Sequence, residues 1–164
     1  MIFEEQVSKL YNEIANEVSG MIPDSWQNIY FKIYINDEGS EAFFFFTKNN
    51  DNKIYYSGDI PELYNVSSDI YIDLLIEVQE KFRKLRAIFK KENQEPWTSC
   101  EFDFSNEGKL NVSFGYIDWK KSDLGQVARF NYYRYKKFGI PPEFEYEREE
   151  IKEIEQFIKE QEEE

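Results

Sequence analysis

The chain has 164 residues, the size of one ordinary domain, with 15 Phe and 12 Tyr to build a core and a formal net charge of −13. This charge argues against direct binding of nucleic acid, because phosphate contacts need a basic surface. It suits a basic protein partner, although solubility alone explains it as well. The sequence has no histidine, so Ser-His-Asp and Cys-His catalytic sites and His-ligated metal sites are excluded.

The first third of the chain predicts one helix followed by a meander of strands. Apolar residues recur every three or four positions over 2–19, which indicates an amphipathic helix that Gly20 ends in the left-handed conformation. The hydrophobic period then changes to two, and strands are expected over 28–36, 41–47 and 53–57.

The middle of the chain predicts a turn and then the longest helix. The segment 58–61 (GDIP) is typical of a turn, and the helix is expected over 68–92. Four basic residues on this helix are expected to form a solvated face, because no surface aromatics interleave with them. They are Lys81, Arg83, Lys84 and Arg86.

A second hairpin and two helices complete the chain. Strands are expected over 98–104 and 109–117, and a helix over 123–138 that Gly139 ends. The tail, about 143–164, predicts an acidic helix over 144–161 with a thin apolar seam at Ile151, Ile154, Phe157 and Ile158. Glu143, Glu145 and Glu147 suit its N-terminus, whereas Glu162, Glu163 and Glu164 oppose the helix dipole, so the last turn is expected to fray.

These elements predict an α+β fold: an antiparallel sheet of about five strands with helices packed on it. No linker divides the sequence, so residues 1–164 are expected to form a single domain. Nothing near Met1 resembles a signal peptide, and no apolar run reaches the roughly 20 residues that span a bilayer. A cytoplasmic protein without a membrane partner is therefore expected.

The residues offer little catalytic chemistry. Cys100 stands alone and has no histidine to activate it, so a buried apolar role is favoured over that of a nucleophile. Glu101 and Asp103 share one strand face and, with Asp118, are the candidate ligands of a carboxylate-only metal site. The solvent face of an amphipathic strand explains the first two better. No phosphate-binding loop or cofactor fingerprint occurs, so no cofactor is expected.

Several short segments resemble one family in their order and spacing. They are 22–26 (IPDSW), 58–66 (GDIPELYNV), 93–98 (NQEPWT), 114–118 (FGYID) and 135–141 (YKKFGIP). Together they resemble the YezG-like family of bacterial immunity proteins, which includes the EsaG-type antitoxins. The resemblance covers most of the chain and ends near Glu147.

The resemblance implies a non-enzymatic antitoxin that binds the nuclease domain of a toxin exported by a type VII-like secretion system. A nuclease presents a basic groove to its substrate, which gives the acidic surface a natural target. The protein would either plug that groove or bind elsewhere and distort the fold of the toxin, and the sequence leaves both mechanisms open.

The expected contacts with this partner are acidic faces and neighbouring aromatic anchors. They are Glu101, Asp103, Asp118, Trp119, Tyr132, Tyr133, Glu149 and Glu153. Two alternatives come from other functional classes: a carboxylate-dependent metal enzyme, and an adaptor protein without a toxin target. Specific binding of Mg²⁺ or Mn²⁺ would favour the first, and a gene neighbourhood without a toxin would favour the second.

Overall fold

The computed structural model describes residues 2–163, so Met1 and Glu164 lie outside the described residues. Glu164 belongs to the last turn that was expected to fray, so that part of the prediction also lies outside them. The chain forms two compact units, Met1–Tyr116 and Ile117–Glu164, which are named unit 1 and unit 2 below. Within the described residues no helix is both long enough and apolar enough to cross a membrane. The expectation of one domain over 1–164 stays a prediction.

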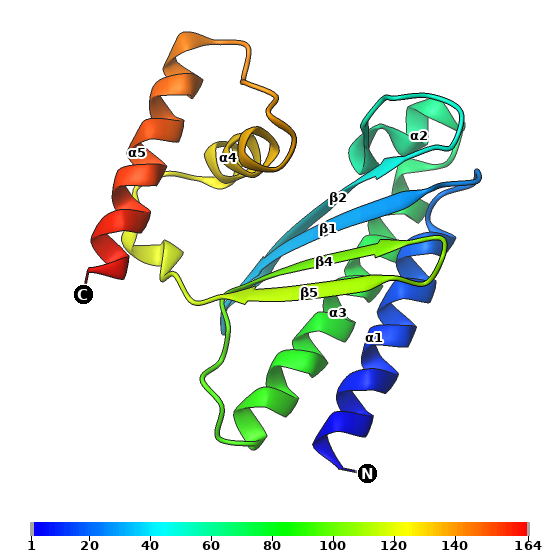
Figure 1. Cartoon of the computed structure of the whole chain (residues 1–164), viewed down its shortest axis with the longest axis horizontal. Coiled ribbons are helices and arrows are strands. Elements are labelled where there is room, and N and C mark those ends of the chain that lie inside the picture. The colour runs from blue at the N-terminus through cyan, green and yellow to red at the C-terminus, as the bar shows by residue number, and fades with distance from the viewer. Residues whose placement is uncertain (1, 164) are drawn as a thin grey trace. The chain divides into compact units, whose positions relative to one another are not determined.

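Unit 1 contains the sheet. Its elements are α1 (Phe3–Gly20), β1 (Asn28–Ile35), β2 (Ser40–Thr47), β3 (Tyr55–Tyr56), η1 (Ser57–Asp59), α2 (Ile60–Leu63), α3 (Ser68–Lys91), β4 (Ser99–Ser105) and β5 (Leu110–Gly115) (Figure 1). Within residues 2–163 the sheet has five strands in the order β3-β2-β1-β4-β5, and every neighbouring pair is antiparallel. The predicted α+β class and antiparallel sheet are confirmed.

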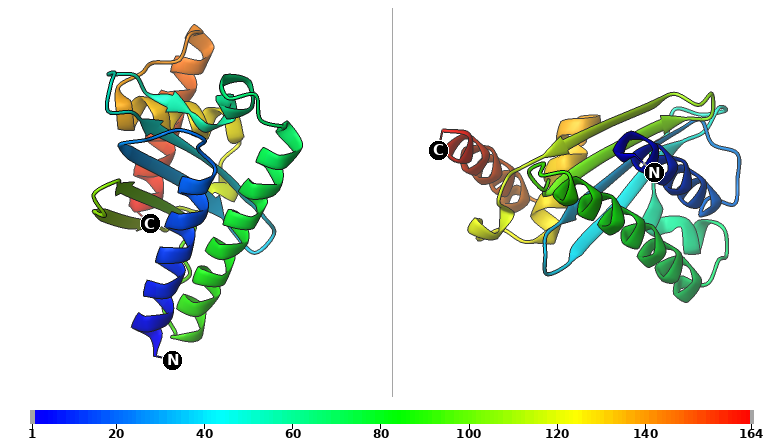
Figure 2. Two further views of the ribbon diagram at one scale, coloured as in Figure 1. Left: turned by 90° about the vertical axis from the view of Figure 1, so that its right-hand side faces the viewer. Right: turned by 90° about the horizontal axis from the view of Figure 1, so that it is seen from below.

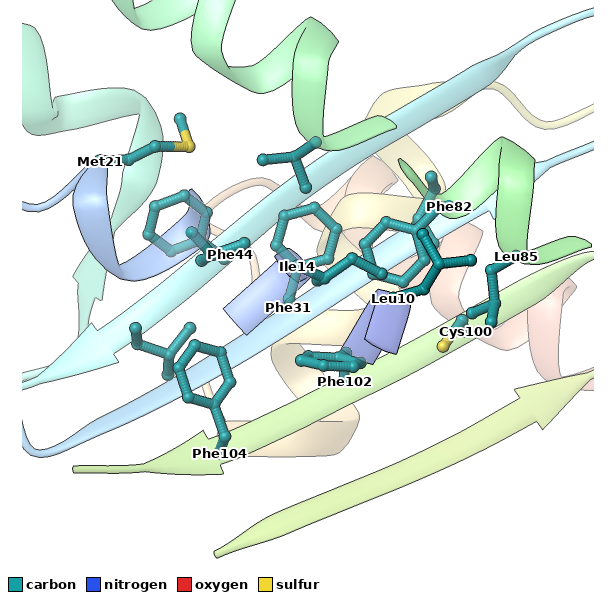
Figure 3. Packing of buried hydrophobic residues seen from close by; sticks show 14 of the residues in the cluster. Leu10, Ile14, Met21, Phe31, Phe44, Phe82, Leu85, Cys100, Phe102 and Phe104 are labelled. Carbon is teal, nitrogen blue, oxygen red and sulfur yellow. The ribbon is translucent and has the colours of Figure 1, made fainter. Parts of the chain in front are cut away.

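Helices α1 and α3 lie side by side on one face of this sheet (Figure 2), and the core fills the space between helices and strands. The register places Phe31 of β1 opposite Phe44 of β2 and Phe102 of β4. Phe82 of α3 stacks on Phe31 with ring centroids 5.1 Å apart and meets Phe102 edge to face at 5.8 Å (Figure 3). The register therefore places Phe31, Phe44 and Phe102 beneath the helices.

Strand β3 is shorter than the predicted 53–57 at both ends: it begins at Tyr55, and the chain leaves the ladder after Tyr56. At that point the buried hydroxyl of Ser57 accepts the backbone N–H of Phe44 at 3.1 Å, in place of a strand carbonyl, and also accepts the hydroxyl of Tyr71. The predicted turn over 58–61 is the end of η1 and the start of the one-turn helix α2. A Cβ at Gly58 would collide with the Tyr56 ring, so this close approach favours glycine.

The basic cluster of α3 is not wholly a solvated face. Lys84 is exposed, but Arg86 is buried with only 9% of its surface exposed. Its Nε donates to the carbonyl of Trp97 at 2.7 Å, and its Nη1 donates to Asp37 at 2.7 Å. Arg86 departs from the prediction because these acceptors replace the water that its guanidinium loses.

Unit 2 consists of η2 (Trp119–Lys121), α4 (Gln126–Phe138) and α5 (Glu145–Glu162). Gly139 adopts the left-handed conformation at φ 69° and ends α4, as predicted. Helix α5 packs on α4, and Ile151 and Ile154 of the predicted seam are buried. Glu162 is the last residue of α5.

Candidate partner-binding surfaces

Glu101 and Asp103 lie on the sheet face opposite α1 and α3, because they alternate along β4 with the buried Phe102. The register places Glu101 beside Lys32 of β1, and their charged atoms are 3.7 Å apart. The Glu101 carboxylate is thus partly balanced by a lysine of the same sheet. Asp103 lies beside a shallow hollow of about 210 Å³. The hollow is lined by Asn28, Tyr30, Asp103, Phe104, Ser105, Lys109, Leu110 and Asn111.

The other six predicted contacts belong to unit 2, and two of them, Asp118 and Trp119, lie at the start of η2. Asp118 is exposed, and its carboxylate accepts the backbone N–H of Lys120 at 3.2 Å, which caps η2. The half-buried ring of Trp119 packs on Phe157 of α5 with centroids 5.8 Å apart. Phe157 of the predicted seam therefore contacts an aromatic ring within its own unit.

The last four contacts lie on α4 and α5. Tyr133 is only 5% exposed and meets Phe138 edge to face, whereas the neighbouring Tyr132 is half-buried. Glu149 and Glu153 are exposed and lie four residues apart on one face of α5. Glu149 pairs with Lys152 at 3.2 Å. Asp118, Glu149 and Glu153 are thus the exposed members of the predicted set.

The sequence reasoning missed two exposed rings at the start of α5. Phe144 is 53% exposed and Tyr146 is 66% exposed, and the rings stack with centroids 5.9 Å apart and planes 12° apart. The signal was the alternation of 143–147 (EFEYE), whose glutamates were interpreted only as charges suited to a helix N-terminus. The same alternation leaves two large aromatic side chains in water among carboxylates.

A basic groove lies between α1 and α3 in unit 1. It has a volume of about 530 Å³ and combines apolar side chains with lysines from both helices. Lys81 pairs with Glu13 at 3.1 Å, while Lys9, Lys84 and Lys91 have no ion pair within residues 2–163. The groove is lined by Gln6, Lys9, Leu10, Glu13, Lys81, Lys84, Ala87, Ile88 and Lys91.

Two of the segments that resemble the immunity family meet in space. Asp24, from 22–26, accepts a hydrogen bond from the Tyr64 hydroxyl, from 58–66, at 2.8 Å and pairs with Lys48 at 2.9 Å. The Lys48 ammonium and the Tyr64 hydroxyl hold the pKa of the Asp24 carboxyl below its ordinary value. The Lys48 ammonium also lies over the ring of Tyr55, 4.5 Å from its centroid. This cluster ties the loop before β1 to the residues that directly follow β2 and α2.

The described residues offer little reactive chemistry. Cys100 is fully buried beneath the helices, and burial raises the pKa of its thiol, so the reactive thiolate is disfavoured. Among residues 2–163, no three Cys, Asp or Glu side chains are close enough together to hold a metal ion. These observations define a small acidic α+β protein whose prominent surface features are charged side chains and exposed aromatic rings.

Comparison with known proteins identifies the family. The family described as "Immunity protein YezG-like" matches residues 7–152, which is most of the chain, and the protein belongs to it. The chain is 55% identical to the type VII secretion system protein EsaG of Staphylococcus aureus (strain NCTC 8325 / PS 47) over 163 residues, covering 99% of this chain and 100% of that protein.

Two immunity proteins called YezG are also similar. The identity is 39% with that of Bacillus spizizenii (strain ATCC 23059 / NRRL B-14472 / W23) over 137 residues, which covers 84% of this chain and 85% of the relative. It is 34% with that of Bacillus subtilis (strain 168) over 140 residues, which covers 85% and 93%. The resemblance inferred from the short segments is confirmed.

Proposed function

We propose that this protein is a cytoplasmic immunity protein that binds and inhibits the nuclease domain of a cognate toxin, one exported by a type VII-like secretion system. The observation that carries the proposal is membership of the immunity family over residues 7–152. The similarity to a type VII secretion system protein, which spans both chains almost completely, supports the link to this export route.

The charge of the chain supports a nuclease as the target. A net charge of −13 attracts a protein that must present a basic surface to nucleic acid, and complementary fields accelerate the encounter. The exposed Glu149 and Glu153 on α5 and the exposed Asp118 are suited to such a contact. The proposed contact set remains Glu101, Asp103, Asp118, Trp119, Tyr132, Tyr133, Glu149 and Glu153.

The experiment uses the toxin encoded beside the gene of this protein. Its C-terminal domain is produced with and without this protein in a bacterial host, and growth and chromosomal DNA integrity are measured. The purified partners are then mixed, and complex formation and cleavage of nucleic acid are followed in parallel. We expect a stable complex, restored growth and loss of cleavage.

The control is an unrelated basic nuclease of similar size. It should remain active in the presence of this protein, because a specific interface needs shape as well as charge. Equal inhibition of both nucleases would show that inhibition arises from nonspecific charge attraction and would contradict a cognate interaction. A complex without inhibition would favour the adaptor alternative, and absence of any complex would refute the proposal.

A further inference from the structure

Two exposed aromatic rings at the start of α5 stand out from the rest of unit 2. Phenylalanine is among the residues most often buried, yet Phe144 exposes 53% of its surface, and Tyr146 beside it exposes 66%. Their rings stack on one another at 5.9 Å. We call Phe144 and Tyr146 the aromatic pair. Adjacent exposed rings of this kind are typical of interaction sites, where aromatic side chains supply much of the binding energy.

The backbone that carries the aromatic pair is held by hydrogen bonds within unit 2. Phe144 N–H donates to the side chain of Glu147 at 3.3 Å, and Glu147 N–H donates back to the Phe144 carbonyl at 3.1 Å. Arg148 donates to the carbonyls of Pro142 at 2.8 Å and Glu143 at 3.0 Å. Asn131 of α4 donates to Glu147 at 2.9 Å. The backbone under both rings is therefore fixed before binding, which lowers the entropy cost of association.

The charges beside the aromatic pair determine the partner that it suits. Glu143 and Glu145 flank Phe144 and are exposed, and neither carboxylate has an ion-pair partner within residues 2–163. The guanidinium of the neighbouring Arg148 is engaged with backbone carbonyls. Aromatic faces attract the cations of arginine and lysine, and carboxylates pair with the same groups. An acidic partner would meet unpaired carboxylates of like charge.

We propose that the aromatic pair is the anchor by which this protein binds a basic segment of its toxin, with arginine or lysine side chains stacked on the two rings and paired with Glu143 and Glu145. This inference rests on the proposed function and names the surface through which the protein would bind its toxin. It holds for either mode of inhibition, because an anchor of this kind serves a protein that blocks a groove as well as one that distorts its target.

The test compares two full-length variants in binding to the nuclease domain of the toxin encoded beside this gene. The first is the double variant Phe144→Ala/Tyr146→Ala. The matched control is Tyr135→Ala, which removes another exposed tyrosine of unit 2, one that follows Arg134 and precedes Lys136. Dissociation constants are measured by surface plasmon resonance, and thermal unfolding is recorded for each variant.

We expect the double variant to raise the dissociation constant by about thirtyfold or more, the change that hot-spot side chains produce, and the control to change it less than about twofold. The melting temperature of the double variant should stay near that of the wild type. The single variant Tyr146→Ala, which removes the more exposed ring, covers the case in which the double variant unfolds, and it should weaken binding in the same direction.

Opposite outcomes separate this inference from the proposed function. A folded double variant that binds as tightly as the wild type would overturn the aromatic anchor while the immunity role stands. Failure of the wild-type protein to bind or inhibit the toxin would instead refute the proposed function. A charge reversal, Glu143→Lys/Glu145→Lys, should weaken binding further when added to Tyr146→Ala, and unchanged affinity would contradict the basic partner.

Discussion

Replacing Arg86 with methionine tests how the long helix is attached to the rest of unit 1. The variant keeps an unbranched side chain that reaches as far as the arginine Nε but removes the donor that bonds the Trp97 carbonyl at 2.7 Å. A hydrogen bond from a charged group contributes about 1.5–3 kcal/mol, and a buried carbonyl left without a donor costs about 1–3 kcal/mol. These effects overlap, so we expect Arg86→Met to lower the free energy of unfolding by about 3 kcal/mol.

The second partner of Arg86 should matter much less. The Asp37 side chain is 70% exposed, and water can replace Arg86 as its partner. Asp37→Asn should therefore destabilise the protein far less than Arg86→Met. As a matched control, Arg83→Met alters a half-buried arginine one turn earlier, whose contacts are both long: 3.9 Å to Glu80 and 3.4 Å to the Ser40 hydroxyl.

Urea unfolding followed by circular dichroism gives the free energy of unfolding for each variant. A loss of about 3 kcal/mol corresponds to a fall in melting temperature of roughly 6–12 °C for a chain of this size. If Asp37→Asn lowered the free energy of unfolding as much as Arg86→Met, the ion pair between Arg86 and Asp37 would be the main interaction of Arg86. If Arg86→Met had no effect, the Trp97 carbonyl would find another donor, and the reasoning from burial would be refuted.

Four further predictions concern the core, the tail, pH and salt. Cys100→Ala should lower stability by roughly 1 kcal/mol in chemical denaturation and leave toxin binding intact; lost inhibition at unchanged stability would make the thiol functional. Truncation after Gln161 should be tolerated in a thermal melt, whereas truncation before Ile151 should harm folding or binding, because Ile151 and Ile154 are buried; equal tolerance of both cuts would contradict this role. Asp24 has a lowered pKa, so its ionised form stabilises the folded chain above about pH 4, and this contribution is lost as the pH falls through the lowered value. Asp24→Asn should then lose less stability on acidification than the wild type. Equal losses of stability in the two proteins would argue against a stabilising role for the contacts of Asp24 with Lys48 and Tyr64. Because the screening length falls from about 10 Å at 0.1 M salt to about 3 Å at 1 M, salt should slow association with the toxin before it changes dissociation, and a salt-independent on-rate would rule out steering.

The change of hydrophobic period predicted most of the fold. Apolar alternation located β1 to within one residue at each end, because one strand face must pack against α1 and α3. The unbroken apolar run from Phe43 to Phe46 located β2 equally well, and its phenylalanines are buried as that run predicts. Strand β3 was overestimated at both ends. At its C-terminal end the Ser57 hydroxyl takes over a ladder position, and side-chain replacements of this kind leave no periodic signal. Gly139 adopts the predicted left-handed cap, whereas Gly20 is the last residue of α1 and has no positive φ.

The candidate surfaces were harder to predict than the fold. Composition identified an acidic protein, but burial of Tyr133 depends on tertiary packing that local sequence does not encode. Arg86 was assigned to solvent because neither of its acceptors can be recognised from the sequence. Asp37 is distant along the chain, and the Trp97 acceptor is a backbone carbonyl, which leaves no mark in a pattern of side chains. The alternation that contains the aromatic pair could be read from the sequence, but only the structure showed that both rings are exposed.

The exposure of the aromatic pair has an evolutionary consequence. Core rings such as Phe82 are held by neighbours on several strands, so their replacement threatens folding and selection restricts their drift. Phe144 and Tyr146 are exposed outside that core, so substitutions there should change the proposed recognition at little cost in stability. After gene duplication, one copy could therefore acquire a new target through a few changes in this segment while both copies kept the same scaffold.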